Sequence, residues 1–263
     1  MTMKKIIVIN PGSTSTKCAV FEYDKLLAEE TIYHDEAYTK QFARIADQKD
    51  FRKDVVMLFL EKNNIALKSI DAVVGRGGLL KPLPKGGTYE VNQKMINDLS
   101  SEAYGSHASN LGAIIAYECS KIYQKPCYIV DPVIVDELDD LARVSGLKGI
   151  ERKSIFHALN QKAVAKRYAK EHKKNYEDIT VIVCHLGGGL SIGLHHKGRV
   201  VDVNNALGGD GPFSPERAGS IPCFSLVDMC FEKNAKKEDI KRKLVREAGL
   251  LSYLDTNDGR ELE

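Results

Sequence analysis

The sequence predicts an α/β protein of two domains. Short strands at residues 71–74 and 127–130 alternate with helical apolar patterns at 50–61 and 106–123, and such alternation is typical of α/β domains with a parallel or mixed sheet. The length of 263 residues fits one large or two modest domains at roughly 100 to 200 residues each. A strand-and-turn motif that occurs twice favours two.

The repeated motif is a β-hairpin whose tight turn consists of small residues. Residues 6–16 (IIVINPGSTST) and 181–191 (VIVCHLGGGLS) each pass from a β-branched strand through a polar residue into such a turn, and an apolar stretch follows. The two turns lie 175 residues apart, which suits two similar domains rather than a solenoid. We therefore predict an N-terminal domain over 1–150 and a C-terminal domain over 151–263.

The second half of the chain contains further predicted elements. They are a helix over 155–172, a third strand over 200–203, an irregular loop over 207–222 and an amphipathic helix over 236–246. The apolar positions of the first helix include Leu159, Val164 and Tyr168, and lysines near its C-terminal end suit the helix dipole. The loop has too much Gly and Pro for regular structure, and long ordered loops of this kind are usually functional.

Composition narrows the compartment and the class of partner. Thirty-eight basic and 36 acidic residues leave a net charge of +2, too little for the field that steers a protein onto nucleic acid or an acidic membrane. The apolar run at residues 6–9 ends after four residues, so it is predicted to be a strand and not a signal peptide or membrane span. The six cysteines form no C-x-x-C pair and are predicted to be buried thiols of a cytoplasmic protein.

The two small-residue turns are candidate phosphate-binding sites, because such turns leave backbone N–H groups unpaired. The first adds the hydroxyls of Ser13 and Ser15 and the ammonium of Lys17. It is not a Walker A loop, since no G-x-x-x-x-G-K-[ST] occurs. The second turn consists of His185, Leu186, Gly187, Gly188 and Gly189. Three consecutive glycines are expected where a ligand or backbone approaches closely, and a plain tight turn is the alternative for each motif.

Phosphoryl transfer needs positive groups around the transferred phosphate, which directs attention to arginines in loops. Arg76 follows the strand at 71–74 amid three glycines, and Arg217 lies in the loop over 207–222. An arginine fork matches carboxylate and phosphate oxygens bidentately; a surface salt bridge is the alternative for each. The other candidates are Asp131 at a strand end, His157 at a helix N-terminus and His107.

Taken together, these residues resemble the acetate and butyrate kinase family of the actin-like ATPase superfamily, and butyrate kinases most closely. The motifs occur in order along the whole chain: INPGSTSTK, VVGRGG, YGSHASNLG, VDPV, SIFHA, HLGGG and LLSYLDTND. The resemblance implies two actin-like (ribonuclease H-like) α/β domains with mixed sheets. It also implies reversible, direct in-line transfer of phosphate from ATP to butyrate or isobutyrate, with Mg²⁺ as cofactor, in a homo-oligomer.

The resemblance also implies roles for the candidate residues. Asn10 would help to place Mg²⁺, and Lys17 with the turn over 185–189 would contact the nucleotide phosphates. Arg76 would hold the substrate carboxylate. Arg217 and His157 would stabilise the transferring phosphoryl group. Two further positions match the family's site, Asp131 and His107. Asp131 would more easily orient substrate and metal than act as an acid or base, because a carboxylate is already ionised at neutral pH. His107 has no assigned role.

Two differences from the family concern the size of the acyl pocket and the length of the chain. Gly77 and Gly78 follow Arg76 where acetate kinases have bulky residues, so a wider acyl pocket and a preference for butyrate or isobutyrate are expected. Family members continue beyond the position of Glu263, so the second domain is expected to be incomplete, without the adenosine-binding loop and a metal-binding Glu. The alternatives are an acetate kinase-like enzyme, or an impaired fragment that only binds phosphate or acyl groups. A sugar kinase or chaperone-type ATPase would not explain both arginines.

Overall fold

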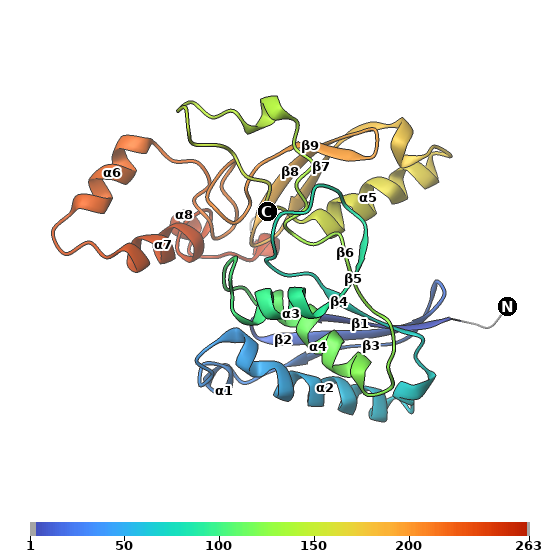
Figure 1. Cartoon of the computed structure of the whole chain (residues 1–263). Coiled ribbons are helices and arrows are strands. Elements are labelled where there is room, and N and C mark those ends of the chain that lie inside the picture. The colour runs from blue at the N-terminus through green and yellow to red at the C-terminus, as the bar shows by residue number, and fades with distance from the viewer. Residues whose placement is uncertain (1–3, 262–263) are drawn as a thin grey trace. The chain divides into compact units, whose positions relative to one another are not determined.

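The computed structural model describes residues 4–261 and divides into two compact units (Figure 1). The first comprises residues 1–82 and 86–134, the second residues 83–85 and 135–263. The predicted boundary at residue 150 therefore falls inside the second unit. The reason is packing, because Val135 and Leu138 belong to the same apolar cluster as Val200. The separate functions assigned to the two domains stay predictions.

The first unit contains a six-stranded mixed sheet in the order β3-β2-β1-β4-β6-β5. Its strands are β1 (Lys5–Pro11), β2 (Ser15–Glu22), β3 (Lys25–Tyr33), β4 (Ala72–Arg76), β5 (Thr88–Glu90) and β6 (Cys127–Val130). The three central strands β1, β4 and β6 are parallel, whereas β2, β3 and β5 pair antiparallel with their neighbours. The predicted α/β class with a mixed sheet, the first hairpin and both short strands are confirmed in this unit.

Helix α4 packs against the centre of this sheet. The helices of the unit are α1 (Glu36–Thr39), α2 (Lys49–Lys62), α3 (Gln93–Ser100) and α4 (Asn110–Lys121), and α4 contacts β1, β4 and β6. Two glycines allow an unusually close approach: a Cβ on Gly75 would lie 2.2 Å from the carbonyl oxygen of Gly112, and a Cβ on Gly112 would lie 2.2 Å from that of Arg76. The helix backbone therefore touches the strand end that carries Arg76.

The second unit contains an antiparallel three-stranded sheet in the order β7-β8-β9. Its strands are β7 (Thr180–Leu186), β8 (Leu190–His196) and β9 (Arg199–Val203), and its helices are α5 (Ala158–Glu171), α6 (Cys223–Phe231), α7 (Lys237–Arg246) and α8 (Leu251–Leu254). The second hairpin, the third strand and the irregular loop over 207–222 are confirmed. The expected mixed sheet is wrong for this unit, where all strand pairs of the described residues are antiparallel.

Helix α5 buries a different face from the one that its apolar residues predict. Leu159, Val164 and Tyr168 are 44–46% exposed, whereas Gln161 and Lys162 are buried. Lys162 tolerates burial because its ammonium lies 2.8 Å from the carboxylate of Glu137, itself buried. The buried face therefore combines this ion pair with the small side chains of Ala158, Ala165 and Ala169, and leaves the larger apolar residues half exposed.

The cysteines divide into two groups. Cys18, Cys119 and Cys127 are buried as predicted, and burial raises the pKa of each thiol to about 12. The prediction is wrong for the other three cysteines, which are exposed: Cys184, Cys223 and Cys230.

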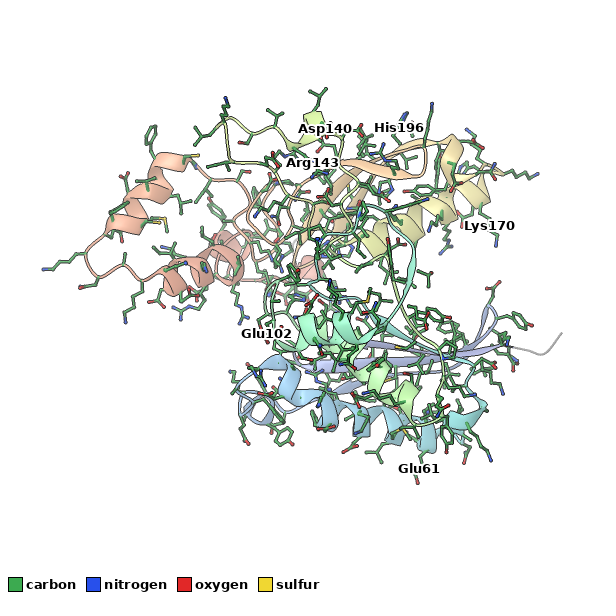
Figure 2. All side chains as sticks on the ribbon, in the orientation of Figure 1. Glu61, Glu102, Asp140, Arg143, Lys170 and His196 are labelled. Atoms are coloured by element: carbon green, nitrogen blue, oxygen red, sulfur yellow. The ribbon has the colours of Figure 1, made fainter. Side chains whose placement is uncertain are left out.

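The surface carries many charged side chains. Exposed residues such as Glu61 on α2 and Lys170 on α5 project from their helices (Figure 2). Among residues 4–261, no helix has the length and apolar character that crossing a membrane requires.

Candidate active site

Three candidate residues of the first unit lie at the same end of its parallel strands. Asn10 is the last but one residue of β1, Arg76 ends β4 and Asp131 follows β6 directly. Because β1, β4 and β6 are adjacent, their carboxyl ends place these three residues along one edge of the sheet. Ligands of open α/β sheets bind at this edge.

Asp131 is held firmly at this edge. Its side-chain Oδ1 accepts a 2.7 Å hydrogen bond from the backbone N–H of Gly87, and its own N–H donates to the carbonyl oxygen of Gly87 at 2.9 Å. It is buried, and its φ of 37° lies in the left-handed region, which aspartate tolerates better than most residues. The backbone thus fixes this carboxylate, which suits an orienting role.

Asn10 and Arg76 contact each other directly. The Nη1 of Arg76 donates to the Oδ1 of Asn10 at 3.3 Å, and burial lowers the pKa of the guanidinium from its ordinary value. Since Asn10 contributes one neutral oxygen that already accepts from a cation, it does not fit a protein-held Mg²⁺ site, which usually uses one or two carboxylates. No cluster of three or more His, Cys, Asp or Glu residues within 4–261 could hold a metal.

His107 lies in the turn that leads into α4. Its Nδ1 accepts from the backbone N–H of Ser109 at 3.2 Å and lies 2.8 Å from the Ser109 hydroxyl. These contacts explain why α4 begins at Asn110 rather than at the predicted residue 106. The neighbouring Asn110 side chain accepts from the N–H of Leu79 at 2.8 Å, which ties this turn to the glycine segment after Arg76.

The structure does not support the argument for a wider acyl pocket at Gly77 and Gly78. A Cβ on Gly77 would lie 2.4 Å from the Cβ of Pro132, and a Cβ on Gly78 would lie 2.6 Å from the Cα of Asn110. The space of the missing side chains is therefore already filled by protein atoms. These glycines permit close packing of the chain beside Arg76 and do not leave room for an acyl tail.

The carbonyl groups of Thr14 and Ser15 in the first turn are engaged in hydrogen bonds within the protein. The Ser15 oxygen accepts from the N–H of Gly12 at 2.8 Å, and the Thr14 oxygen accepts from the N–H of His34 at 2.8 Å. Among the described residues, the N–H groups of Ser13 and Thr14 have no hydrogen-bond partner. Such an arrangement of N–H groups is a favourable cradle for an anion.

The ammonium of Lys17 is not left unpaired beside this turn, because it forms an ion pair with a carboxylate. Lys17 faces Asn10 across the hairpin, but its ammonium lies 2.6 Å from the carboxylate of Glu29 on β3. Both side chains are about half exposed, so this pair is weak and can exchange for another anion.

Arg52 on α2 is a functional candidate that the sequence analysis missed. It is 1% exposed, and its guanidinium donates to the carbonyl oxygens of Ser13 and Ser15 at 3.0 and 2.6 Å and to the side chains of Thr16 and Gln48. Burial lowers its pKa to about 10, so it keeps its charge at neutral pH. The sequence signal is its spacing, because Arg52 shares the buried face of α2 with Val56 and Phe59.

In the second unit, His157 and His185 stack on each other. His157 is the N-cap residue of α5, and His185 lies on β7. Their ring centroids are 3.7 Å apart and their planes differ by 8°. His157 Nδ1 lies 2.9 Å from the Ser191 hydroxyl, and the side chain of Asn160 contacts the Nδ1 of His185 at 2.9 Å. The start of helix α5 and the hairpin of β7 and β8 are therefore in contact through two of the predicted site residues.

The glycine turn faces Arg217. A Cβ on Gly189 would lie 2.8 Å from the Nη1 of Arg217 and 3.3 Å from the Cε1 of His157. A Cβ on Gly188 would lie 3.0 Å from the carboxylate of Glu216, and one on Gly187 would lie 3.3 Å from the Nε2 of His185. At Gly189, the absence of a side chain is what lets Arg217 and His157 lie so close to this turn. Leu186 is 73% exposed and alternates with His185 along β7, so it points to the opposite face of the sheet.

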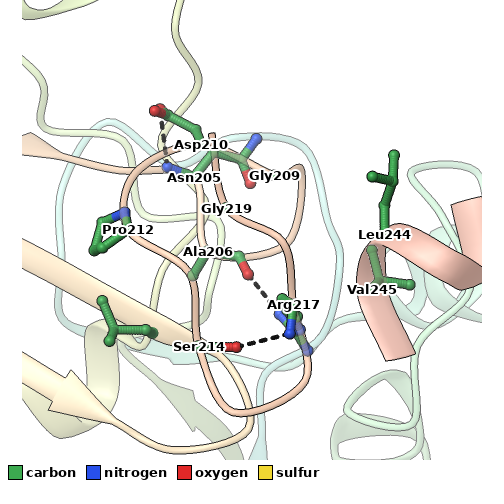
Figure 3. A pocket seen from close by; sticks show the side chains of 11 residues that line it. Asn205, Ala206, Gly209, Asp210, Pro212, Ser214, Arg217, Gly219, Leu244 and Val245 are labelled. Carbon is green, nitrogen blue, oxygen red and sulfur yellow. Dashed lines mark hydrogen bonds between the residues drawn. The ribbon is translucent and has the colours of Figure 1, made fainter. Parts of the chain in front are cut away.

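Arg217 is partly buried and lines a small pocket (Figure 3). Its Nη1 donates to the carbonyl oxygen of Ala206, and its backbone N–H donates to the hydroxyl of Ser214 at 3.1 Å. Its Nε is buried and, among the described residues, has no hydrogen-bond partner. Burial lowers the pKa of the guanidinium, while Glu216 raises it. A buried donor without an acceptor is costly, so the guanidinium of Arg217 is incompletely paired in this structure.

The loop that carries Arg217 is braced by the chain segment over 244–251. Ala218 N–H donates to the Leu244 oxygen, and the N–H groups of Leu250 and Leu251 donate to the oxygens of Ser214 and Pro215, at 2.8 to 3.1 Å. The hydroxyl of Ser214 in turn donates to the Gly188 oxygen at 2.6 Å. The loop is therefore fixed both to the glycine turn and to the helices near the end of the described chain.

Comparisons with known proteins find a family model that matches part of the chain and solved structures of the same fold. A family model described as the acetokinase family matches residues 142–263. Those residues carry His157, the glycine turn and Arg217.

Solved structures extend the likeness to nearly the whole chain. The acetate kinase of Porphyromonas gingivalis matches with a TM-score of 0.76 at 17% identity, over 98% of this chain and 72% of its own. A propionate kinase from Francisella tularensis matches with a TM-score of 0.75 at 21% identity, over 99% and 72%. The acetate kinase of Entamoeba histolytica matches with a TM-score of 0.71 at 18% identity, over 98% and 70%. The chain therefore has the actin-like α/β fold of these kinases.

Proposed function

We propose that the chain is a carboxylate kinase that transfers the terminal phosphoryl group of ATP reversibly to a short-chain carboxylate, giving an acyl phosphate and ADP. The observation that carries the proposal is Arg217, whose buried Nε donor has no partner among the described residues and whose Nη1, like the ring of His157, lies beside Gly189. An anion-seeking guanidinium beside a glycine turn suits the equatorial oxygens of a transferring phosphoryl group. The acetokinase match covers the same residues.

The reaction requires positioning and charge neutralisation more than proton transfer. A carboxylate oxygen attacks the γ-phosphorus, the new oxygen–phosphorus bond forms and the bond to the ADP oxygen breaks. Because a carboxylate is already ionised at neutral pH, no base has to remove a proton. Arg76 would hold the carboxylate bidentately, and the fixed Asp131 carboxylate would orient the substrates. Arg217 and His157 would stabilise charge on the phosphoryl oxygens.

Each unit has a turn that would suit the nucleotide phosphates. The N–H groups of Ser13 and Thr14 and the glycine turn over 187–189 supply backbone donors, and Lys17 can leave Glu29 for a phosphate. Since Asn10 alone does not fit a resident metal, Mg²⁺ would enter as part of the nucleotide substrate, as is common for this ion.

The preferred acyl chain remains a narrower proposal. We propose butyrate or isobutyrate on the resemblance of the ordered motifs alone, because Pro132 and Asn110 occupy the space beside Gly77 and Gly78. Comparison of kcat/KM for acetate, propionate, butyrate and isobutyrate tests it. A value for acetate or propionate equal to or above that for butyrate and isobutyrate would contradict the preference, without affecting the proposal of a carboxylate kinase.

Trapping of the product with hydroxylamine tests the proposed reaction. Acyl hydroxamate should form only with ATP, Mg²⁺ and a carboxylate present together. Arg76→Ala and Arg217→Ala should lower kcat/KM by about 100-fold or more, whereas the exposed control Arg167→Ala, which loses only a pair with Glu171 on the same helix, should retain activity. A folded protein that binds nucleotide but forms no hydroxamate with any of the four carboxylates would overturn the proposal and favour a binding-only role.

A further inference from the structure

We propose that a buried chain of hydrogen bonds in the second unit holds His157 in the neutral form that carries its proton on Nε2, and that Ser191 and Gln161 are positioning residues for this histidine. The tautomer follows from contacts within one unit. Its use in phosphoryl transfer rests on the proposed function.

The chain runs through five residues. His157 Nδ1 lies 2.9 Å from the Ser191 hydroxyl, and Gln161 Nε2 donates to that hydroxyl at 2.8 Å and to the Ser191 carbonyl oxygen at 2.9 Å. Gln161 Oε1 lies 3.0 Å from His195 Nε2, and the Tyr176 hydroxyl lies 2.7 Å from His195 Nδ1. Ser191, Gln161 and His195 are fully buried, so water does not compete for these contacts.

One carbonyl group sets the direction of most of the chain. The Ser191 carbonyl oxygen can only accept, so the Gln161 atom that contacts it must be the amide nitrogen. The other amide atom, Oε1, can then only accept, which places a proton on His195 Nε2. His195 is neutral, because burial and the nearby Lys162 lower its pKa to about 4, so its Nδ1 accepts from the Tyr176 hydroxyl.

The same reasoning fixes the other end of the chain. The Ser191 hydroxyl oxygen already accepts from Gln161, and its hydrogen still needs an acceptor. Among the described residues, His157 Nδ1 is the group in position to take it. If His157 Nδ1 carried the proton instead, the Ser191 hydroxyl would be a buried donor without a partner, at a cost of about 1–3 kcal/mol. His157 therefore accepts on Nδ1 and carries its proton on Nε2.

The surroundings are built around the Gln161 side chain. A Cβ on Gly193 would lie 2.2 Å from Gln161 Oε1, so only glycine at this position of β8 leaves room for the amide. Near the other end, Arg217 and the ring edge of His157 both lie beside Gly189, and His185 stacks on the face of the His157 ring. A neutral His157 avoids a second positive charge between these groups and still presents an N–H donor for a phosphoryl oxygen.

Nitrogen-15 NMR of protein labelled at histidine tests the tautomer without any assay of activity. The cross-peak pattern of His157, assigned by its loss in His157→Gln, should show a protonated Nε2 and an unprotonated Nδ1 at pH 7.5. Ser191→Ala and Gln161→Leu should convert it to a mixture of tautomers. Ser191→Thr, which keeps the hydroxyl, should retain the native pattern, as should the exposed control Ser225→Ala. A predominant Nδ1–H form in the unmodified protein would overturn the proposal, and only the assignment of the signal needs a folded His157→Gln variant.

Kinetics then test the positioning role separately. Ser191→Ala should lower kcat by about tenfold with little change in KM for the carboxylate, and Ser191→Thr should restore it. A shift of tautomer with full activity would overturn the positioning role. If the unmodified protein shows the Nε2–H tautomer but no kinase activity, the proposed function fails while the tautomer assignment stands.

Discussion

At the scale of single residues, the buried charge of Arg52 is the feature most in need of an explanation. Buried guanidinium groups usually pair with carboxylates, but here the described partners are two carbonyl oxygens, a hydroxyl and an amide oxygen. These neutral acceptors orient the charge without cancelling it. The first turn therefore has a fixed positive charge behind its N–H groups, which raises its affinity for an anion.

Arg52→Lys should weaken nucleotide binding more than it weakens the fold. A lysine keeps the charge but cannot bridge the oxygens of Ser13 and Ser15 and the side chain of Gln48 as a planar fork does. We expect the Kd for Mg-ADP, measured by calorimetry, to rise by about tenfold. Arg44→Lys, at an exposed arginine that pairs only with the nearby Asp47, is the control. An unchanged Kd in a folded Arg52→Lys protein would show that Arg52 is merely structural.

Residues at strand ends could be predicted from the sequence, whereas residues that act through others could not. Arg76 and Asp131 each lie at the end of a short stretch rich in β-branched residues and precede Gly or Pro, which is a local signal. Gln161 lies 30 residues from Ser191, its partner, and nothing in the local sequence of either indicates the contact. Dependence on residues far away in the sequence also explains why the acyl-pocket argument failed. The space beside Gly77 is occupied by Pro132, which is distant in the chain.

At the scale of elements, the loop that carries Arg217 depends on the segment after α7. Gly249 has a φ of +63°, and a Cβ at this position would lie 1.9 Å from the carbonyl oxygen of Ser214. A side chain would therefore separate the two segments as well as strain the backbone. The brace on the loop rests on this glycine.

Gly249→Ala should lower kinase activity because it displaces the loop and with it the Arg217 guanidinium. We expect kcat/KM to fall by at least about tenfold and the free energy of unfolding of the second unit to fall by about 1–3 kcal/mol. The matched control is Gly146→Ala, since a Cβ there meets no atom within 4 Å. Equal activity of the two variants in the hydroxylamine assay, after circular dichroism has shown both to be folded, would contradict the role of the brace.

The elements themselves were more predictable than their packing. Strand and helix positions follow from local periodicity, and the hairpin repeat correctly indicated a β-hairpin in each unit. The buried face of α5 did not follow, because it combines the pair between Lys162 and Glu137 with small alanines and leaves Leu159 and Val164 half exposed. Periodicity counts apolar residues, but a buried ion pair depends on a partner elsewhere in the chain.

At the scale of the whole molecule, each unit contains a histidine that stays neutral in the fold. Burial, together with the charge of Arg52, lowers the pKa of His34 in the first unit to about 4, and burial lowers that of His195 in the second unit to about 4. Both rings also take part in hydrogen bonds, His34 with Thr16 at 2.8 Å and His195 with Tyr176 at 2.7 Å. Protonation would disturb both networks, so acid should weaken both units.

The free energy of unfolding should therefore fall as the pH decreases from about 6.5 towards 4. Above pH 6.5 both histidines are neutral in the folded and unfolded chains, and they give no pH dependence. Below it the unfolded chain binds protons that the folded chain does not, so unfolding becomes easier. For the fully buried His195 the loss between pH 7 and 5 should be about 2 kcal/mol, and for the partly exposed His34 it should be smaller.

Urea unfolding at pH 7, 6 and 5 measures this dependence. His34→Asn should reduce it, and the NMR signals of His195 in the folded protein should not titrate above pH 5; a titration of His195 near pH 6.5, or an identical pH dependence in His34→Asn, would contradict the assignment.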